Sequence, residues 1–205
     1  MTLTRCIMYG IFAAALFCGE GAAAVRIPLM VKEALASGTP GTDRIAEPVT
    51  IGVPLAENSG IRSTSQLGLE GAKKAQFKAL GAWPNGNVRW VVIDTLASLN
   101  AGQTNHSLVL RDGGSGNFGG ASLAVEDPDY ITVDTGSATF RIRRRNFNFF
   151  DQVTVGGSVL VMPGNPGCLR VRDADNKTYA SSNDDASTAT VEENGPVKAV
   201  VKAVG

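Results

Sequence analysis

The chain has 205 residues, its 19 Lys and Arg are balanced by 19 Asp and Glu, and 43% of its residues are hydrophobic. This composition is typical of a folded protein with one substantial core, and it excludes a disordered chain, collagen and a coiled coil. Because the formal net charge is zero, no global field would gather nucleic acid or anionic lipid. The single histidine excludes metal or catalytic sites that need two imidazole groups.

Residues 1–24 have the pattern of a secretory signal peptide. An apolar run at 6–18 follows Arg5, and Ala22 and Ala24 supply the small residues that a signal peptidase requires. The run is short for a membrane span, so an uncleaved anchor is the less favoured alternative. We expect cleavage before Val25 and a secreted or periplasmic protein that keeps no membrane segment.

After this cleavage Cys168 is the sole cysteine, so the exported chain has no internal disulfide and depends on packing for its stability. We expect Cys168 to be a small, buried, apolar residue. No second cysteine or histidine stands near it in the sequence to support a thiolate nucleophile.

Short runs rich in β-branched and aromatic residues recur at roughly ten-residue intervals. Turns containing glycine, proline, asparagine or aspartate separate these runs, and no capped helical pattern of about ten residues follows the signal sequence. The sequence therefore predicts an all-β domain of short, mostly antiparallel strands, arranged as a barrel or a sandwich. The expected strands are 49–55, 76–82, 88–96, 107–110, 130–133, 139–143, 151–155, 169–171, 189–191 and 197–204.

The segment 83–90, WPNGNVRW, predicts a tight hairpin with a tryptophan at each shoulder. Its central Asn-Gly pair accepts the positive φ angles of such turns. Trp90 precedes an apolar run and is expected in the core, whereas Trp83 fits equally well a core position or an exposed platform on which a sugar ring could stack.

Four segments along the chain form a recognisable set: VRIPL at 25–29, EPVTIGVPL at 47–55, QFKAL at 76–80 leading into WPNGNVRW, and EENGPVKAV at 192–200. Together they resemble the N-terminal domain of exo-rhamnogalacturonan-lyase-type proteins, a domain called a RIFT barrel. The resemblance implies that 25–205 is a β-barrel-like N-terminal module of a secreted, bacterial, polysaccharide lyase-like protein. In that family the lyase chemistry is associated with later domains, chiefly an α/α toroid, so no catalytic residue is carried over.

The apolar segment 197–204 ends one residue before the end of the sequence, where further β-structure would be expected. We therefore expect the module to be truncated at its C-terminal end. A downstream catalytic or helical domain of the same polypeptide is its expected partner.

Three patterns imitate catalytic or nucleotide sites. The triplet at 134–136 matches that of aspartic proteases, but one triplet supplies half a site, and a hairpin turn is the favoured interpretation. Glycines with dinucleotide-loop spacing occur at 114–119, where the sequence leaves no room for the helix that would hold a pyrophosphate. His106 is the only possible base of a serine triad, and the chain has no G-x-S-x-G elbow.

Residues 173–177 begin like a calcium-binding loop, because alternating carboxylates can direct several oxygens at one hard cation. Lys177 at the fifth loop position and Thr178 in place of the turn glycine break the pattern. We expect a solvated acidic loop, no metal site and no cofactor.

The run RIRRR at 141–145 is the strongest local charge excess. On a strand, Arg141 and Arg143 would share one face, where guanidinium groups can bind the carboxylates of an acidic polysaccharide in a bidentate manner. The alternative is a solvated face paired with nearby acids. The phenylalanines that follow could stack on nucleic-acid bases, but export argues against that partner. The glycan-binding candidates are Trp83, Arg141, Arg143 and Arg145.

Two classes of function follow. The favoured one is a secreted, non-catalytic β-module that positions or binds an acidic glycan, with a cell-surface scaffold as its close alternative. The other is a stand-alone hydrolase that uses the carboxylates of Asp134 or of the Asp173 cluster. No acid and base are paired at close spacing in the sequence, which favours the first class.

Overall fold

The computed structural model describes residues 24–34 and 40–205, so the expected signal peptide lies outside the described residues. The chain divides into two compact units, Met1–Gly120 (unit 1) and Ala121–Gly205 (unit 2). The described part of both units consists of antiparallel strands and two short 3-10 turns without an α-helix, which confirms the predicted all-β class. Within that part, no helix is long and apolar enough to cross a membrane.

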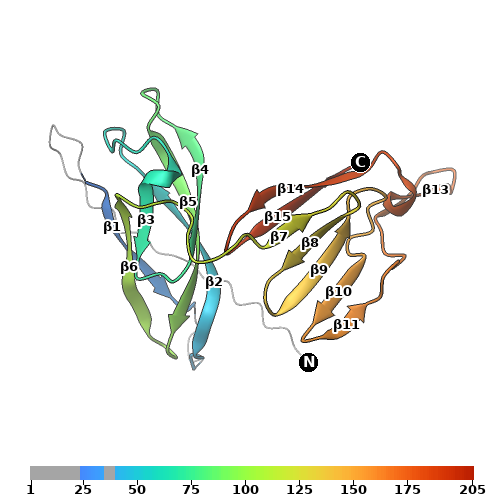
Figure 1. The fold of residues 1–205 in the computed structure, drawn as a ribbon, viewed down its shortest axis with the longest axis horizontal. Helices are drawn as coiled ribbons and strands as arrows, with labels where there is room; N and C mark the ends of the chain where they lie inside the picture. The colour runs from blue at the N-terminus through green and yellow to red at the C-terminus, as the bar shows by residue number, and fades with distance from the viewer. Residues whose placement is uncertain (1–23, 35–39) are drawn as a thin grey trace. The chain divides into compact units, whose positions relative to one another are not determined.

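Unit 1 contains two three-stranded antiparallel sheets, with strand orders β1-β6-β3 and β2-β5-β4 (Figure 1). A short 3-10 turn, η1, precedes β3 and is capped by Ser63, whose hydroxyl accepts a hydrogen bond from the backbone of Ser65. The elements are β1 Arg26–Lys32, β2 Arg44–Pro54, η1 Thr64–Gln66, β3 Leu67–Glu70, β4 Ala75–Ala82, β5 Val88–Leu99 and β6 Thr104–Asp112.

One hydrophobic core joins the two sheets of unit 1. In β5 the side chains of Val91, Ile93 and Thr95 are fully buried, and they alternate with residues of the opposite face, as the two-residue period of a strand requires. Leu67 and Leu110 bring β3 and β6 into the same core. The β-branched residues that mark these strands in the sequence are thus the residues that fill the interior.

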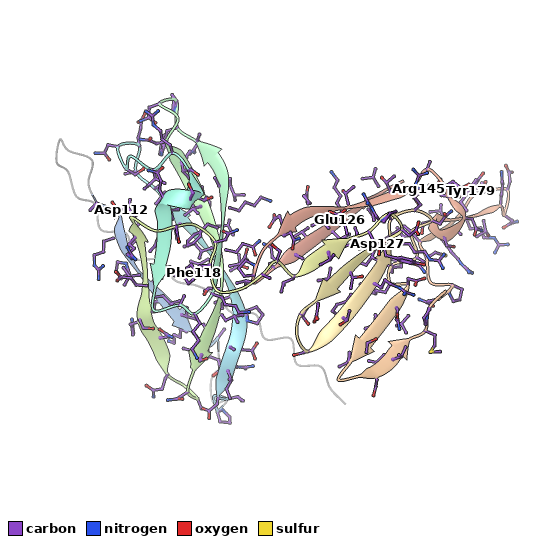
Figure 2. The ribbon with its side chains drawn as sticks, in the orientation of Figure 1. Asp112, Phe118, Glu126, Asp127, Arg145 and Tyr179 are labelled. Carbon is purple, nitrogen blue, oxygen red and sulfur yellow. The ribbon has the colours of Figure 1, made fainter. Side chains whose placement is uncertain are left out.

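The glycine-rich segment that follows β6 lies against unit 1 as an ordered connection. The amides of Gly114 and Gly116 donate to the carbonyls of Gln66 and Leu67, and Phe118 exchanges two backbone hydrogen bonds with Ala75. Phe118 packs against the core and lies among the strands of unit 1 (Figure 2). No helix follows these glycines, so the spacing that imitates a dinucleotide loop serves close backbone packing.

A buried carboxylate links β1 to β2. Glu33 accepts hydrogen bonds from Arg44 Nε and Nη2, at 2.9 and 2.6 Å, and from the Thr42 amide at 3.2 Å. The Arg44 hydrogen bonds lower the pKa of Glu33 below its ordinary value, against the opposing effect of burial. Acid protonation of Glu33 would therefore weaken this link.

Unit 2 is built on a five-stranded antiparallel sheet with the order β11-β10-β9-β8-β7. Two hairpins, β12-β13 and β14-β15, complete it (Figure 1). The elements are β7 Ala124–Glu126, β8 Tyr130–Asp134, β9 Ala138–Arg143, β10 Gln152–Val155, β11 Ser158–Val161, β12 Arg170–Arg172, β13 Thr178–Ala180, η2 Ser181–Asn183, β14 Thr188–Asn194 and β15 Ala199–Val204.

The β14-β15 hairpin packs on one face of the five-stranded sheet. Ile131 and Ile142 of the sheet and Ala189 of the hairpin form a small second core. Asn194 holds the hairpin to β7, because its side chain accepts from the Ala124 amide at 2.9 Å and donates to the Ala124 carbonyl at 2.8 Å. The opposite face of the three central strands, β8, β9 and β10, carries polar side chains.

Each strand expected from the sequence overlaps a strand of the structure. Within the described ranges the sheets do not close into a barrel, so the barrel alternative is not seen there, while the antiparallel pairing is confirmed. The boundaries of the domain expected at 25–205 stay a prediction.

Candidate functional site

The polar face of the five-stranded sheet carries a cluster of two arginines on one buried carboxylate, here called the Arg141–Arg143–Asp151 cluster. Arg141 donates from Nε and Nη2 to Asp151 Oδ2, at 3.0 and 2.6 Å, and Arg143 donates from Nε to Oδ1 at 2.8 Å. The Gly164 amide also donates to Oδ1, at 3.1 Å. Asp151 is 1% exposed, whereas the arginine side chains are about one-third exposed.

Strand register places the two arginines on one polar surface, and Asp151, which directly precedes β10, donates from its amide to the Arg141 carbonyl at 2.7 Å. Arg141 pairs with Thr132 of β8 and Gln152 of β10, and Arg143 pairs with Tyr130. Directly opposed residues of antiparallel strands lie on the same face, so these side chains form one polar surface. The Arg141 guanidinium lies 4.6 Å from the centroid of the Tyr130 ring, a cation–π contact that further restricts it.

Asp151 is ionised in the folded protein. Burial opposes its charge, but the hydrogen bonds from Arg141, Arg143 and the Gly164 amide outweigh burial and lower the pKa of Asp151 below its ordinary value. The cluster therefore holds two positive charges against one negative charge.

Several guanidinium donors of the cluster remain available. Arg143 uses only Nε in hydrogen bonds with described residues, and Arg141 uses Nε and Nη2. Within the described ranges, the two Nη groups of Arg143 and Nη1 of Arg141 make no hydrogen bond. Such donors, on side chains already held in place, are suited to a carboxylate or another anion.

The other two arginines of the run have different roles. Arg144 lies 3.6 Å from Glu126 and donates to the Asp127 carbonyl at 3.0 Å, both of which Figure 2 labels. Arg145 is exposed, its backbone bridges to Thr188, and no carboxylate among the described residues pairs with it (Figure 2). The structure thus joins Arg141 and Arg143 through Asp151 and leaves Arg145 outside this contact.

The two tryptophans differ in their surroundings. Trp83 is half-buried, donates from Nε1 to the Leu55 carbonyl at 3.0 Å, and has the Arg89 guanidinium 5.2 Å from its ring centroid. A glycan contact at Trp83 stays a prediction. The core position expected for Trp90 is wrong: Trp90 is 41% exposed, because its side of β5 faces away from the core.

The segments that imitate active sites form turns. The Asp134 carboxylate accepts from the Gly136 amide at 2.7 Å, and Thr135 closes the β8–β9 hairpin through Ala138. Asp173 likewise accepts from two backbone amides in the β12–β13 turn. His106 is exposed on β6.

The described segments contain no group of three or more His, Cys, Asp or Glu side chains placed to hold an ion.

Cys168 is not the buried residue expected from the sequence. It is half-buried, and Arg170 Nε donates to its Sγ at 3.3 Å. Hydrogen bonds from Arg170 and Ser182 lower the pKa of the thiol. Its loop position, away from the strands' inner faces, is the physical reason for the difference.

Asp151 is the residue of the cluster that was not expected from the sequence to bind the arginines. The local signal is an acid placed directly after Phe149 and Phe150 at the start of an expected strand, ten residues beyond Arg141. Strand alternation alone would not have identified the contact, because Gln152, and not Asp151, pairs with Arg141 in β9.

Comparison with protein-family models and with curated proteins finds no match to this chain.

Proposed function

We propose that this chain is a secreted, non-catalytic β-module that binds an acidic glycan through the Arg141–Arg143–Asp151 cluster. The observation that carries the proposal is the pair of guanidinium groups held by one buried carboxylate, with an excess positive charge and outward donors. Since Asp151 and Tyr130 already restrict the arginines, little conformational entropy is lost when a uronate carboxylate binds.

The resemblance to the RIFT-barrel domain of exo-rhamnogalacturonan-lyase-type proteins extends this proposal. The module would be the N-terminal accessory part of a larger lyase-like protein, exported by its signal peptide and joined to a catalytic domain. In support, the segment 83–90 forms the β4–β5 turn and the start of β5, and the Trp83 amide donates to the Asn87 carbonyl at 2.7 Å. The segment 47–55 lies in and directly after β2, the neighbour of β5.

Replacing Arg143 with lysine is expected to weaken retention by polygalacturonate about fivefold, because lysine keeps the charge but loses the planar pair of outward donors. Affinity electrophoresis through gels containing polygalacturonate or a neutral glucan measures this retention. Retention by polygalacturonate should also fall with added salt, since exposed charges are screened within about 8 Å at physiological ionic strength.

Arg172→Gln is the matched control, because Arg172 is an exposed arginine of β12 outside the cluster. It should leave retention within about twofold of the parent protein's. Equal retention of the parent protein by acidic and neutral polymers would contradict the proposal and favour a cell-surface scaffold. Thermal unfolding of each variant verifies that the fold is intact.

A further inference from the structure

Trp90 is a large exposed aromatic side chain on the outer face of the β2-β5-β4 sheet. Its neighbours in β5, Val91 and Ile93, point into the core and are fully buried, whereas Trp90 is 41% exposed. A residue of this size at the surface of a sheet contributes a substantial aromatic area to solvent.

The backbone of the neighbouring strand restricts where the indole can lie. A β carbon placed on Gly52 would lie 3.0 Å from Trp90 Nε1, 3.2 Å from Cζ2 and 3.3 Å from Cε2. The Nε1 edge of the ring therefore occupies the space that a side chain at position 52 would take. Because Gly52 has no side chain, the ring rests against β2 itself.

The strand partners of Trp90 leave the ring accessible. Trp90 lies opposite Pro54 of β2 and Gly81 of β4, neither of which carries a long side chain that could cover it. Nε1 makes no hydrogen bond with a residue that the structure describes. Ionisable neighbours on this face include Lys78, opposite Val92, and Asp94, which is 3% exposed and accepts from Thr50.

We propose that Trp90 is a second glycan contact, which binds one pyranose ring by stacking it on the indole. The C–H groups of a pyranose carry partial positive charge and are attracted to the electron-rich face of the ring. A tryptophan already held against the strand loses little rotamer freedom on binding. This inference rests on the glycan ligand of the proposed function, but it concerns unit 1 and uses ring stacking in place of charge.

The chain has two tryptophans, so replacing Trp83 allows the emission of Trp90 to be observed alone. In a Trp83→Phe variant of the full chain, Trp90 is the sole source of tryptophan emission. Titration with oligogalacturonate and with neutral galactan oligomers should give a saturable change in emission. Trp90→Ala in the parent protein should weaken binding of the same oligomers about tenfold, as removal of a stacking ring does elsewhere.

A pair of glycine variants tests the position of the ring without removing it. Gly52→Ala introduces a methyl group into the space of the Nε1 edge and should weaken binding several-fold. Gly81→Ala is the matched control, because Gly81 also faces Trp90 across a strand pair but a β carbon there meets nothing within 4 Å. It should bind as the parent protein does.

The outcomes separate this site from the arginine cluster. A Trp90 emission change that persists when Arg143→Lys is added to the Trp83→Phe variant supports the site as an independent contact. Emission unresponsive to both oligomers overturns it, even where polygalacturonate retention still depends on Arg143. Equal binding by Gly52→Ala, Gly81→Ala and the parent protein also overturns it. If Gly52→Ala does not fold, Trp90→Leu replaces it, and unchanged binding by that variant overturns the site.

Discussion

Asp151→Asn is expected to lower the free energy of unfolding of unit 2 by about 2 kcal/mol at neutral pH. The carboxylate is 1% exposed and accepts from two guanidinium groups. Asparagine keeps the shape but removes the charge and leaves the arginines facing each other without their common partner. This expected loss is smaller than the loss from breaking a fully buried ion pair, because water still reaches the arginines. Urea unfolding followed by circular dichroism and by tyrosine emission measures it.

The pH dependence of the stability difference between the parent protein and Asp151→Asn tests whether the charge of Asp151 is its cause. The folded-state pKa of Asp151 lies below its ordinary value of 3.8, so its contribution is complete above that value and is lost as the pH falls through the lower, folded-state pKa. The difference between parent protein and variant should therefore shrink as the pH falls below 3.8. Glu33 and Asp127, whose pKa values are also lowered, are present in both proteins and cancel in the comparison.

Asp175→Asn is the control for Asp151. Asp175 lies exposed in the β12–β13 turn, and only its backbone amide takes part in the hydrogen bond with Asp173. It should change the stability by less than about 0.5 kcal/mol. A constant difference between Asp151→Asn and the parent protein across the acidic range would show that the variant acts through packing and not through charge.

Gly119→Ala is expected to destabilise unit 1 by about 3 kcal/mol. Gly119 has a φ of +92°, which costs an L-residue energy in itself, and a β carbon there would collide with the Lys73 carbonyl and lie 2.7 Å from Lys74 Cα. The preceding residue, Phe118, is hydrogen-bonded to Ala75 at this point, so the backbone cannot withdraw without breaking that pair. Both tryptophans belong to unit 1, and their emission therefore reports its unfolding directly.

Gly102→Ala separates the cost of backbone strain at positive φ from the cost of the steric collision. Gly102 has a φ of +69°, but a β carbon there meets nothing within 4 Å. It should cost about 1 kcal/mol from backbone strain alone. If both variants lose the same stability, the 114–120 segment does not pack tightly against the turn before β4, and the steric explanation of the glycine spacing is wrong.

Local chemistry was enough to place many of the strands. Val91 and Ile93 recur with the two-residue period of a strand, and the Asn85–Gly86 pair marks the β4–β5 turn, where Gly86 has a φ of +85°. Strand β1 was not among the expected strands. Its Pro28, a residue disfavoured in central strands, is tolerated because β1 lies at the edge of the β1-β6-β3 sheet.

Periodicity states which residues of a strand share a face, but not which face is covered. In β5, Trp90 was expected in the core. Because β3 and β6 pack on the opposite face of β5, Trp90 is instead exposed. In β9 the alternation placed Arg141 and Arg143 together, as the sequence indicated. Their common partner, Asp151, comes from the segment just before β10, where its amide donates to the Arg141 carbonyl and its carboxylate accepts from both arginines.

The sequence by itself thus determined the all-β class, most strand positions and the shared face of Arg141 and Arg143, because these depend on residues close together along the chain. The tertiary structure alone decided the burial of Asp151, the support of Trp90 by Gly52 and the close packing of the 114–119 glycines. Each of these joins segments that are distant in sequence or paired across a sheet, and such contacts depend on the register and packing of whole strands.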